Sequence, residues 1–306
     1  MKTISKKSTI ASNRKNFFKI TAHDISAWSL MLPSLFLFFF IMWQPIYTGI
    51  KNSFFELKGY TAVAFVWFDN YKKVLSDTLF PVVLKNTFSY IFWSFVIGFL
   101  PPFICAVFIN EMVHLKGYFK FSIYFPVIIP SVAVYMIWYF FYQPGEGGIL
   151  NYFLSLFNIP PSMWLQNTKL TIMLIVLTMS WHSFGGTMIT YLAALQGINQ
   201  ELYEAAKIDG AGIFERAKVV IFPHMRGILL LMAIRQIIGV FQVMEQPLMM
   251  TGGGPNNASV TIALQTYKYA FEYYKMHYSL ALSTVTFCLL LILTVIYAFA
   301  ERRIDQ

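Results

Sequence analysis

Long uncharged segments restrict what this chain can fold into more than any other feature. Five of them contain no Asp, Glu, Lys or Arg, and each has at least the roughly 20 residues that a helix needs to cross a ~30 Å hydrocarbon layer. They are residues 25–50, 86–110, 121–145, 170–200 and 278–300. A sixth segment, 227–252, is apolar except for Arg235 and Glu245. Helices satisfy their backbone amides internally in lipid, so we predict an all-α membrane protein with six transmembrane helices.

Composition agrees with this class. The chain has 306 residues, of which 57% are hydrophobic and only 12% are charged, and this balance does not cover a water-soluble surface. The first apolar segment is too long for a signal-peptide core and no small-residue cleavage pattern follows it, so we expect a retained anchor. We predict a basic tail (1–24), a six-helix transmembrane domain (25–300) and a short C-terminal tail (301–306).

The distribution of Lys and Arg predicts the orientation. The two tails and the second and fourth connections between spans hold 14 of the 23 basic residues, and the other three connections hold 8. Because basic residues concentrate on the cytoplasmic side, we expect both termini and the connection around 199–223 to be cytoplasmic. This bias also accounts for most of the net charge of +9, so no nucleic-acid partner is implied.

The chain lacks the patterns of enzymes and of metal or nucleotide sites. Its two cysteines, Cys105 and Cys288, each lie inside a predicted span and suggest neither a disulfide nor a metal cluster. There is no phosphate-binding Gly-rich loop, so the chain is not expected to bind ATP itself. No nucleophile with a nearby base and no clustered acids or histidines are evident, so we predict no enzymatic activity and no cofactor.

Three connections are expected on the external side. The first contains "FVWFDNYKKVLSDTLFP", which predicts a helix along the membrane surface ending before Pro81. The second, 143–169, contains "PGEGG" and "PP" and is expected to be rich in turns. The third, "TGGGPNNAS" at 251–259, stops a helix; it either exposes backbone amides to a partner or polar ligand or simply terminates the helix.

The cytoplasmic segment 199–223 contains "YEAAKIDGAG" between two apolar segments. Asn199 is placed to cap a short helix that ends at Ile208, and Gly210 to end it. We expect a second short helix, capped by Asp209, to run as far as Phe222 and stop at Pro223. From physics alone this element either transmits force or is an amphipathic loop that connects two spans.

The spacing of this segment resembles the EAA signature of the permease subunits of bacterial ABC importers. In "EAAKIDGAGIFERAKVVIFP", the EAA-x-x-DGA pattern is followed after eleven residues by proline. Further stretches resemble the carbohydrate-uptake branch of that family, which includes maltose and glycerol-phosphate transporters. These are "LPSLFLFFFIMWQPIYTGIKNSF", "FDNY" with "NTFSY", "WHSFGGTMITYLAALQGI" and "TGGGPNNAS". The resemblance extends from Leu32 to the C-terminus.

This resemblance implies a type I ABC importer permease fold in a bacterial inner membrane, with defined partners. They are a second homologous permease, a dimer of ABC ATPases and an extracytoplasmic solute-binding protein. The EAA segment would act as a coupling helix that docks on the ATPase, with Glu204 and Gly210 as its principal residues. The other expected coupling residues are Ala205, Ala206, Asp209, Ala211 and Phe214. Ala217 departs from the family, where this position often holds an aromatic residue.

The resemblance also nominates a substrate site on the spans before and after the EAA segment. The matching stretches are "MSWHSFGG" and "RQIIGVFQVME". They nominate Ser180, His182, Gln236 and Gln242 as polar contacts and Trp181 and Phe241 as stacking neighbours. Two alternatives remain open: His182 packs between helices, or the partner permease holds the whole site.

Arg235 is an unusual residue to find within a span, because a cation there is costly. On a straight helix Glu245 would lie about 15 Å along the axis and off the same face, so it is a poor partner. We expect Arg235 to reach the interface or to pair with another span, the alternative being a gate or a ligand contact.

These features favour a subunit of an ATP-driven importer for a sugar or oligosaccharide. One alternative is an ATP-independent secondary carrier or channel, although that class usually shows buried acids or inverted repeats. Another is an ABC importer for a different solute, such as a glycerol phosphate ester.

Overall fold

The computed structural model describes residues 22–304, and this part of the chain is mostly helical. It forms two compact units, one ending at Lys51 and the other beginning at Asn52. The first contains α1 (Ala22–Phe38), a π-helical turn (Phe39–Trp43) and nearly all of α2 (Gln44–Asn52). From Ser26 to Tyr47 its side chains are exposed and mostly apolar, as expected for a helix whose surroundings are lipid. The predicted tail at 1–24 lies largely outside the described residues.

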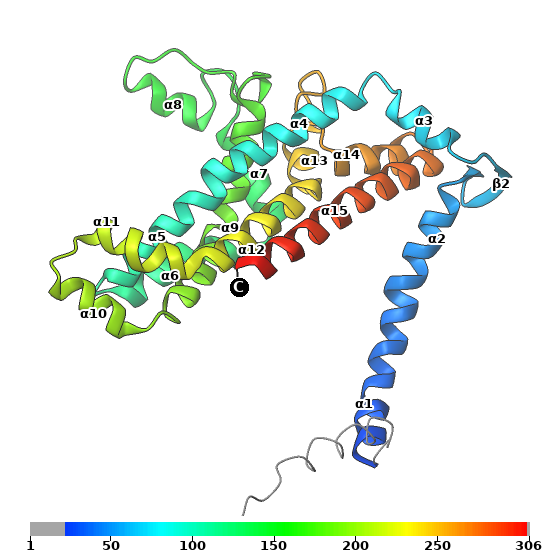
Figure 1. Ribbon diagram of the computed structural model, residues 1–306. Helices are drawn as coiled ribbons and strands as arrows, with labels where there is room; N and C mark the ends of the chain where they lie inside the picture. The colour runs from blue at the N-terminus through cyan, green and yellow to red at the C-terminus, as the bar shows by residue number, and fades with distance from the viewer. Residues whose placement is uncertain (1–21, 305–306) are drawn as a thin grey trace, which may run out of the picture. The chain divides into compact units, whose positions relative to one another are not determined.

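The second unit holds the remaining elements (Figure 1). Its first half contains β1 (Phe55–Lys58), β2 (Thr61–Phe65), α3 (Asp69–Leu75), α4 (Phe80–Trp93), η2 (Ser94–Phe99), α5 (Leu100–Glu111), α6 (Lys116–Ile128), α7 (Ser131–Phe141) and α8 (Ile149–Ser155). Its second half contains η3 (Trp164–Gln166), α9 (Thr171–Leu195), α10 (Gln200–Ile208), α11 (Ile213–Arg216), η4 (Ala217–Ile221), α12 (Phe222–Phe241), α13 (Glu245–Thr251), α14 (Ile262–Tyr267), η5 (Lys268–Glu272) and α15 (Met276–Ile304).

Among the described residues, five helices are long and apolar enough to cross a membrane. They are Ser26–Asn52, Phe80–Glu111, Thr171–Leu195, Phe214–Phe241 and Met276–Glu301. A sixth span results if α6 and α7, which meet at 92°, are counted together. The span expected at 121–145 is therefore bent. The bend lies at Pro130: a residue before proline favours an extended conformation, and Ile129 adopts one, with φ −73° and ψ 133°.

A small β-hairpin departs from the all-α prediction. β1 and β2 pair antiparallel across a turn that contains Gly59, with a bulge between Glu56 and Leu57. The strands are only four and five residues long, too short for their alternation to stand out from the flanking apolar sequence. A helix before Pro81, predicted from the sequence, is present as α3, and Pro81 lies in the first turn of α4, where proline needs no amide partner.

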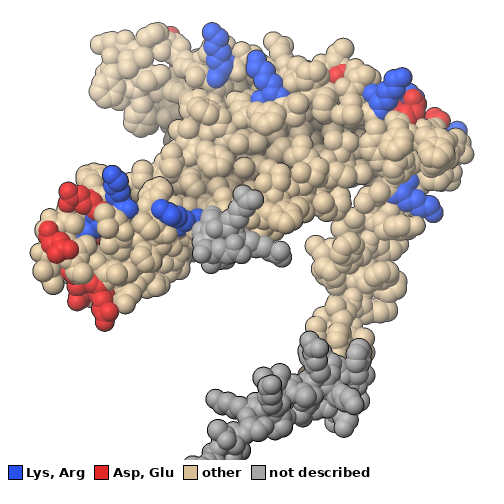
Figure 2. Space-filling view, in the orientation of Figure 1, with Lys and Arg blue, Asp and Glu red and all other residues tan. Residues whose placement is uncertain are grey.

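The helix α9 lies at the centre of the second unit and packs against α4, α5, α6, α7 and α12. α12 in turn packs along α15. The connection formed by α10 and α11 lies at one end of the unit, far from α3 (Figure 1). Figure 2 shows acidic side chains gathered at that end, while the middle of the same face is uncharged. This distribution suits a unit whose middle lies in lipid.

The second short helix after Gly210 differs from its prediction. It does not stop at Pro223 but continues through the π-helical turn η4 into α12, so that Phe214–Phe241 forms one span. A proline inside a regular α-helix clashes with the carbonyl one turn earlier, and the wider turn just before Pro223 relieves this conflict. The span that starts here also ends early: α12 stops at Phe241 and α13 begins at Glu245, where the sequence suggested one helix to Gly252.

Candidate functional site: the coupling segment and the membrane cavity

The start of the coupling segment, residues 199–223, is a capped short helix. The Asn199 side chain accepts a hydrogen bond from the Glu201 amide at 3.0 Å, as expected for an N-cap. Tyr203 is buried on the inner face of α10 and packs with Leu195 and Ile221 in an apolar cluster. The amphipathic pattern of α10 thus fixes which face turns toward the helix bundle.

A left-handed turn at Gly210 ends α10. Gly210 has φ +80°, the Ala211 amide donates to the Ala206 carbonyl at 2.9 Å, and the Gly210 amide donates to the Lys207 carbonyl at 3.0 Å. These two bonds form a Schellman motif, which explains the requirement for glycine at this point. The next helix is capped by Glu215, whose carboxylate accepts a hydrogen bond from the Gly212 amide at 3.0 Å. Asp209, the cap predicted from the sequence, makes no side-chain hydrogen bond within the described chain.

The outer face of the coupling segment carries most of the residues that the sequence nominated for coupling. Glu204, Ala205, Asp209 and Gly210 are exposed, and Ala206 and Ala211 are half-buried. Phe214 is 85% exposed, and Ile208, which the sequence analysis missed, is 87% exposed. Such apolar exposure beside polar residues is typical of a surface that a partner covers.

Arg216 fastens this segment to the bundle. Its Nη2 lies 2.7 Å from the Glu111 carboxylate at the end of α5, and its Nη1 donates to the Ala211 carbonyl at 2.7 Å. Burial, reinforced by the charge of Glu111, raises the pKa of the Tyr203 phenol beside this pair, and Arg216 partly offsets the effect. No local sequence pattern indicates this pairing, because 105 residues separate the two partners.

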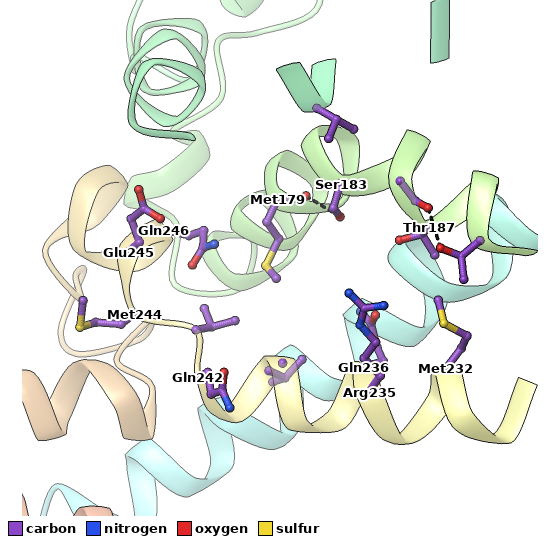
Figure 3. A pocket seen from close by; sticks show the side chains of 16 residues that line it. Met179, Ser183, Thr187, Met232, Arg235, Gln236, Gln242, Met244, Glu245 and Gln246 are labelled. Atoms are coloured by element: carbon purple, nitrogen blue, oxygen red, sulfur yellow. Dashed lines mark hydrogen bonds between the residues drawn. The ribbon is translucent and has the colours of Figure 1, made fainter. Parts of the chain in front are cut away.

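A cavity of about 570 Å³ opens between α9, α12 and the start of α13 (Figure 3). The residues that line it recur every three or four positions along α9 and α12, because each helix turns one face toward the cavity. The lining side chains from α9 include Met179, Ser183, Thr187 and Thr190, and those from α12 include Met232, Arg235 and Gln236. The break after Phe241 adds Gln242, Glu245 and Gln246.

The two charged residues of this wall lie in different parts of it. Arg235 extends from α12 toward Ser183 and Thr187 on α9, while Glu245 lies at the start of α13 (Figure 3). The Glu245 carboxylate accepts a hydrogen bond from the Ser131 hydroxyl at 2.7 Å. The straight helix assumed between Arg235 and Glu245 is interrupted, and no ion pair joins them in the described chain.

Of the six residues nominated for substrate, Gln236 and Gln242 line this cavity. Ser180 is buried against Gly98: a β-carbon built on that glycine would lie 2.8 Å from the Ser180 hydroxyl and 3.2 Å from the Gln236 amide nitrogen. Trp181 packs edge to face on Trp138, with ring centroids 5.7 Å apart. Neither Ser180 nor Trp181 forms part of the cavity wall.

His182 and Phe241 also lie outside the wall. His182 Nε2 lies 2.9 Å from the Ile129 carbonyl, at the bend between α6 and α7. This contact satisfies a carbonyl beside the bend, which matches the interhelical alternative for His182. Phe241 is buried in an apolar cluster with Leu264 and Leu282. The sequence pattern that indicates the lining residues is the i, i+4 repeat of Met179, Ser183 and Thr187, which places their side chains on one face of α9.

Comparison with known proteins agrees with this architecture. Residues 98–306 match the family described as binding-protein-dependent transport system inner membrane component. The trehalose/maltose transport system permease protein MalF of Thermococcus litoralis is 32% identical over 241 residues, covering 78% of this chain and 80% of that protein. The arabinooligosaccharides transport system permease protein AraP of Bacillus subtilis is 28% identical over 264 residues, covering 85% and 83%.

The same fold occurs in a solved structure. It is a bacterial ABC transporter involved in the import of the acidic polysaccharide alginate, with a TM-score of 0.82 and 20% identity over 93% of this chain and 97% of that one. The family match covers more than half of the chain, and several described helices are apolar enough to span a membrane. The chain therefore belongs to the family of inner-membrane components of binding-protein-dependent transport systems.

Proposed function

We propose that this chain forms, together with a second homologous permease, the translocation pathway of an ATP-driven importer for a sugar or oligosaccharide. The observation that carries this proposal is the exposed face of the coupling segment. Its Schellman turn presents Glu204, Ile208 and Phe214 to a partner, while Arg216 fastens the same segment to the bundle. A chain that belongs to a transport family and lacks a phosphate-binding loop needs such a contact with a separate ATPase.

The proposed topology has six spans and two cytoplasmic termini. α6 and α7 together count as the third span, with the bend at Pro130 inside it. An even number of spans returns the chain to its starting side, and the excess of Lys and Arg assigns that side to the cytoplasm. α10 and α11 then face the cytoplasm, where an ATPase can reach them.

Coupling would proceed by rigid-body motion. When an ATPase dimer closes on ATP, the docked segment moves, and the Glu111–Arg216 contact passes this motion to α5 while η4 passes it to α12. The bundle would alternate between two packings that expose the cavity to opposite sides of the membrane. On the external side, a solute-binding protein would deliver the solute.

The saccharide assignment rests on the cavity and on the names of relatives. The wall offers amides and hydroxyls from Gln236, Gln242, Gln246, Ser183 and Thr187, which suit the hydroxyl groups of a sugar. The relatives named above are described as transporting trehalose and maltose, or arabinooligosaccharides, and another, from Rhizobium radiobacter, as transporting lactose.

The test is ATP-dependent uptake by the complete importer in vesicles. We expect Glu204→Lys and Gly210→Asp to abolish uptake while the chain still inserts at its normal level, because both changes alter the docking face. Normal uptake by both variants would remove the coupling assignment. Transport that persists without a co-expressed ATPase would instead favour a secondary carrier or channel.

Sugar binding tests the cavity separately. We expect Gln236→Ala and Gln242→Ala to weaken binding, because each removes a donor and an acceptor from the wall. His182→Ala serves as the comparison, since His182 contacts the Ile129 carbonyl and lies outside the wall. Unchanged affinity in both glutamine variants would assign the site to the partner permease.

A further inference from the structure

The side chain of Arg235 reaches into the cavity without a protein partner. It extends from α12 toward Ser183 and Thr187 (Figure 3), and within the described chain it makes neither an ion pair nor a hydrogen bond. Of the three hydroxyls on the α9 side of the cavity, those of Ser183 and Thr190 donate to carbonyls of their own helix. The guanidinium donors of Arg235 therefore remain available to a solute.

The single acid of the cavity wall does not neutralise this cation. Glu245 is held by the Ser131 hydroxyl at the start of α13 with Gln246 beside it, and Gln242 lies at the end of α12 (Figure 3). The wall thus has a cationic region on α12 and a region of amides with one carboxylate at the helix break. A carboxylate accepts hydrogen bonds from sugar hydroxyls and amides both accept and donate them, whereas an unpaired guanidinium is best matched by an anion.

The location of Arg235 strengthens this requirement. A cation within a membrane-spanning helix is costly unless it faces water, an acid or a bound ligand, and Arg235 lies inside the span Phe214–Phe241. Guanidinium also matches a carboxylate geometrically, because two parallel N–H groups can bind its two oxygens. With a volume of about 570 Å³, the cavity falls in the range of roughly 300–1,000 Å³ that is usual for small-molecule sites.

We propose that the solute is an acidic saccharide, whose carboxylate binds Arg235 while its hydroxyls bind Gln242, Glu245 and Gln246. This inference rests on the proposed function, since it assigns a substrate class to the same cavity. It makes Arg235 a determinant of specificity rather than a snorkelling residue. The competing occupant of Arg235 is an acid on the second permease.

The experiment uses the complete importer, with its binding protein, second permease and ATPase, in proteoliposomes. The probes are di- and trisaccharides that contain a uronic acid, each paired with the neutral sugar obtained by reducing the carboxylate to an alcohol. We expect at least one acidic probe to be taken up faster than its neutral counterpart. Arg235→Gln should lower uptake of that probe about tenfold or more, since a charge-assisted bond is lost, and Arg235→Lys should lower it less.

The matched control is Gln242→Ala, which should lower uptake of the acidic probe and its neutral counterpart by similar factors. Uptake of neutral saccharides alone, or equal uptake of the acidic probe by the wild type and Arg235→Gln, overturns the acidic-solute proposal and leaves the proposed function intact. If Arg235→Gln prevents the two permeases from pairing, Arg235 belongs to the interface between them, and this result also overturns the acidic-solute proposal. If the wild type takes up no saccharide, the proposed function fails as well.

Discussion

The carboxylate of Glu111 lies 2.7 Å from Nη2 of Arg216, and this contact joins the end of α5 to the helix that follows the Gly210 turn. Both side chains are largely buried, with 15% and 11% of their surface exposed. Arg216 also binds the Ala211 carbonyl, so one guanidinium holds the turn and the bundle together. A partner that pushes on α10 would therefore move α5 with it.

Breaking this pair should damage both stability and coupling. Removing one member of a largely buried ion pair leaves an uncompensated charge, at a cost of up to about 3–5 kcal/mol, so Glu111→Gln and Arg216→Gln should each lower the melting temperature and ATP-dependent uptake. The double variant Glu111→Arg with Arg216→Glu should recover part of both. The exposed pair Lys73–Asp69 provides the control, since Lys73→Gln should have little effect. No recovery in the double variant would argue against a direct link.

The turn at Gly210 should tolerate only residues that accept a left-handed conformation. Gly210→Ala has open space for its β-carbon but must adopt φ near +80°, which costs about 1–2 kcal/mol, and Gly210→Asn should be milder. Gly212→Ala is the matched control, because it also meets open space and has no such φ. Uptake and thermal unfolding should rank the variants with Gly212→Ala least affected; equal effects at both glycines would contradict the role of the turn.

Close contact between α6 and α9 should depend on Gly185. A β-carbon there would lie 2.5 Å from the Ile123 carbonyl oxygen and from Tyr124 Cα, so Gly185→Ala must push the two backbones apart. We expect a loss of about 1–3 kcal/mol, measured as a lower melting temperature. Gly186→Ala meets nothing within 4 Å and should be neutral or slightly stabilising. The prediction fails if the two neighbours behave alike.

The loop at 251–259 should depend on one buried amide. Asn86 on α4 donates to the carbonyls of Asn257 and Val260, at 2.8 and 3.0 Å. Asn86→Ala leaves these carbonyls without their donor, at a cost of about 1–3 kcal/mol, and Asn86→Asp replaces the donor by a charged acceptor. Limited proteolysis should cut the loop faster in both. Lys85→Ala, next along α4 but exposed, should match the wild type.

Features with a local cause were predictable from the sequence. Length and the absence of charge indicated the apolar helices, and the Asn199 cap and the Gly210 turn followed from backbone chemistry within a few residues. The EAA spacing, read through its resemblance, indicated the family that the comparison confirmed. In each case the determining interactions lie within a few turns of the chain, so the local sequence contains them.

Only the tertiary structure decided which residues meet. It paired Glu111 with Arg216, gave His182 the Ile129 carbonyl, and brought Gln236, Gln242 and Arg235 to one cavity. It also bent the third apolar segment at Pro130, and it carried the helix through Pro223, where local rules predicted a stop. The composition of the chain shows which helices prefer lipid, but the face that each helix turns inward depends on its packing against distant helices.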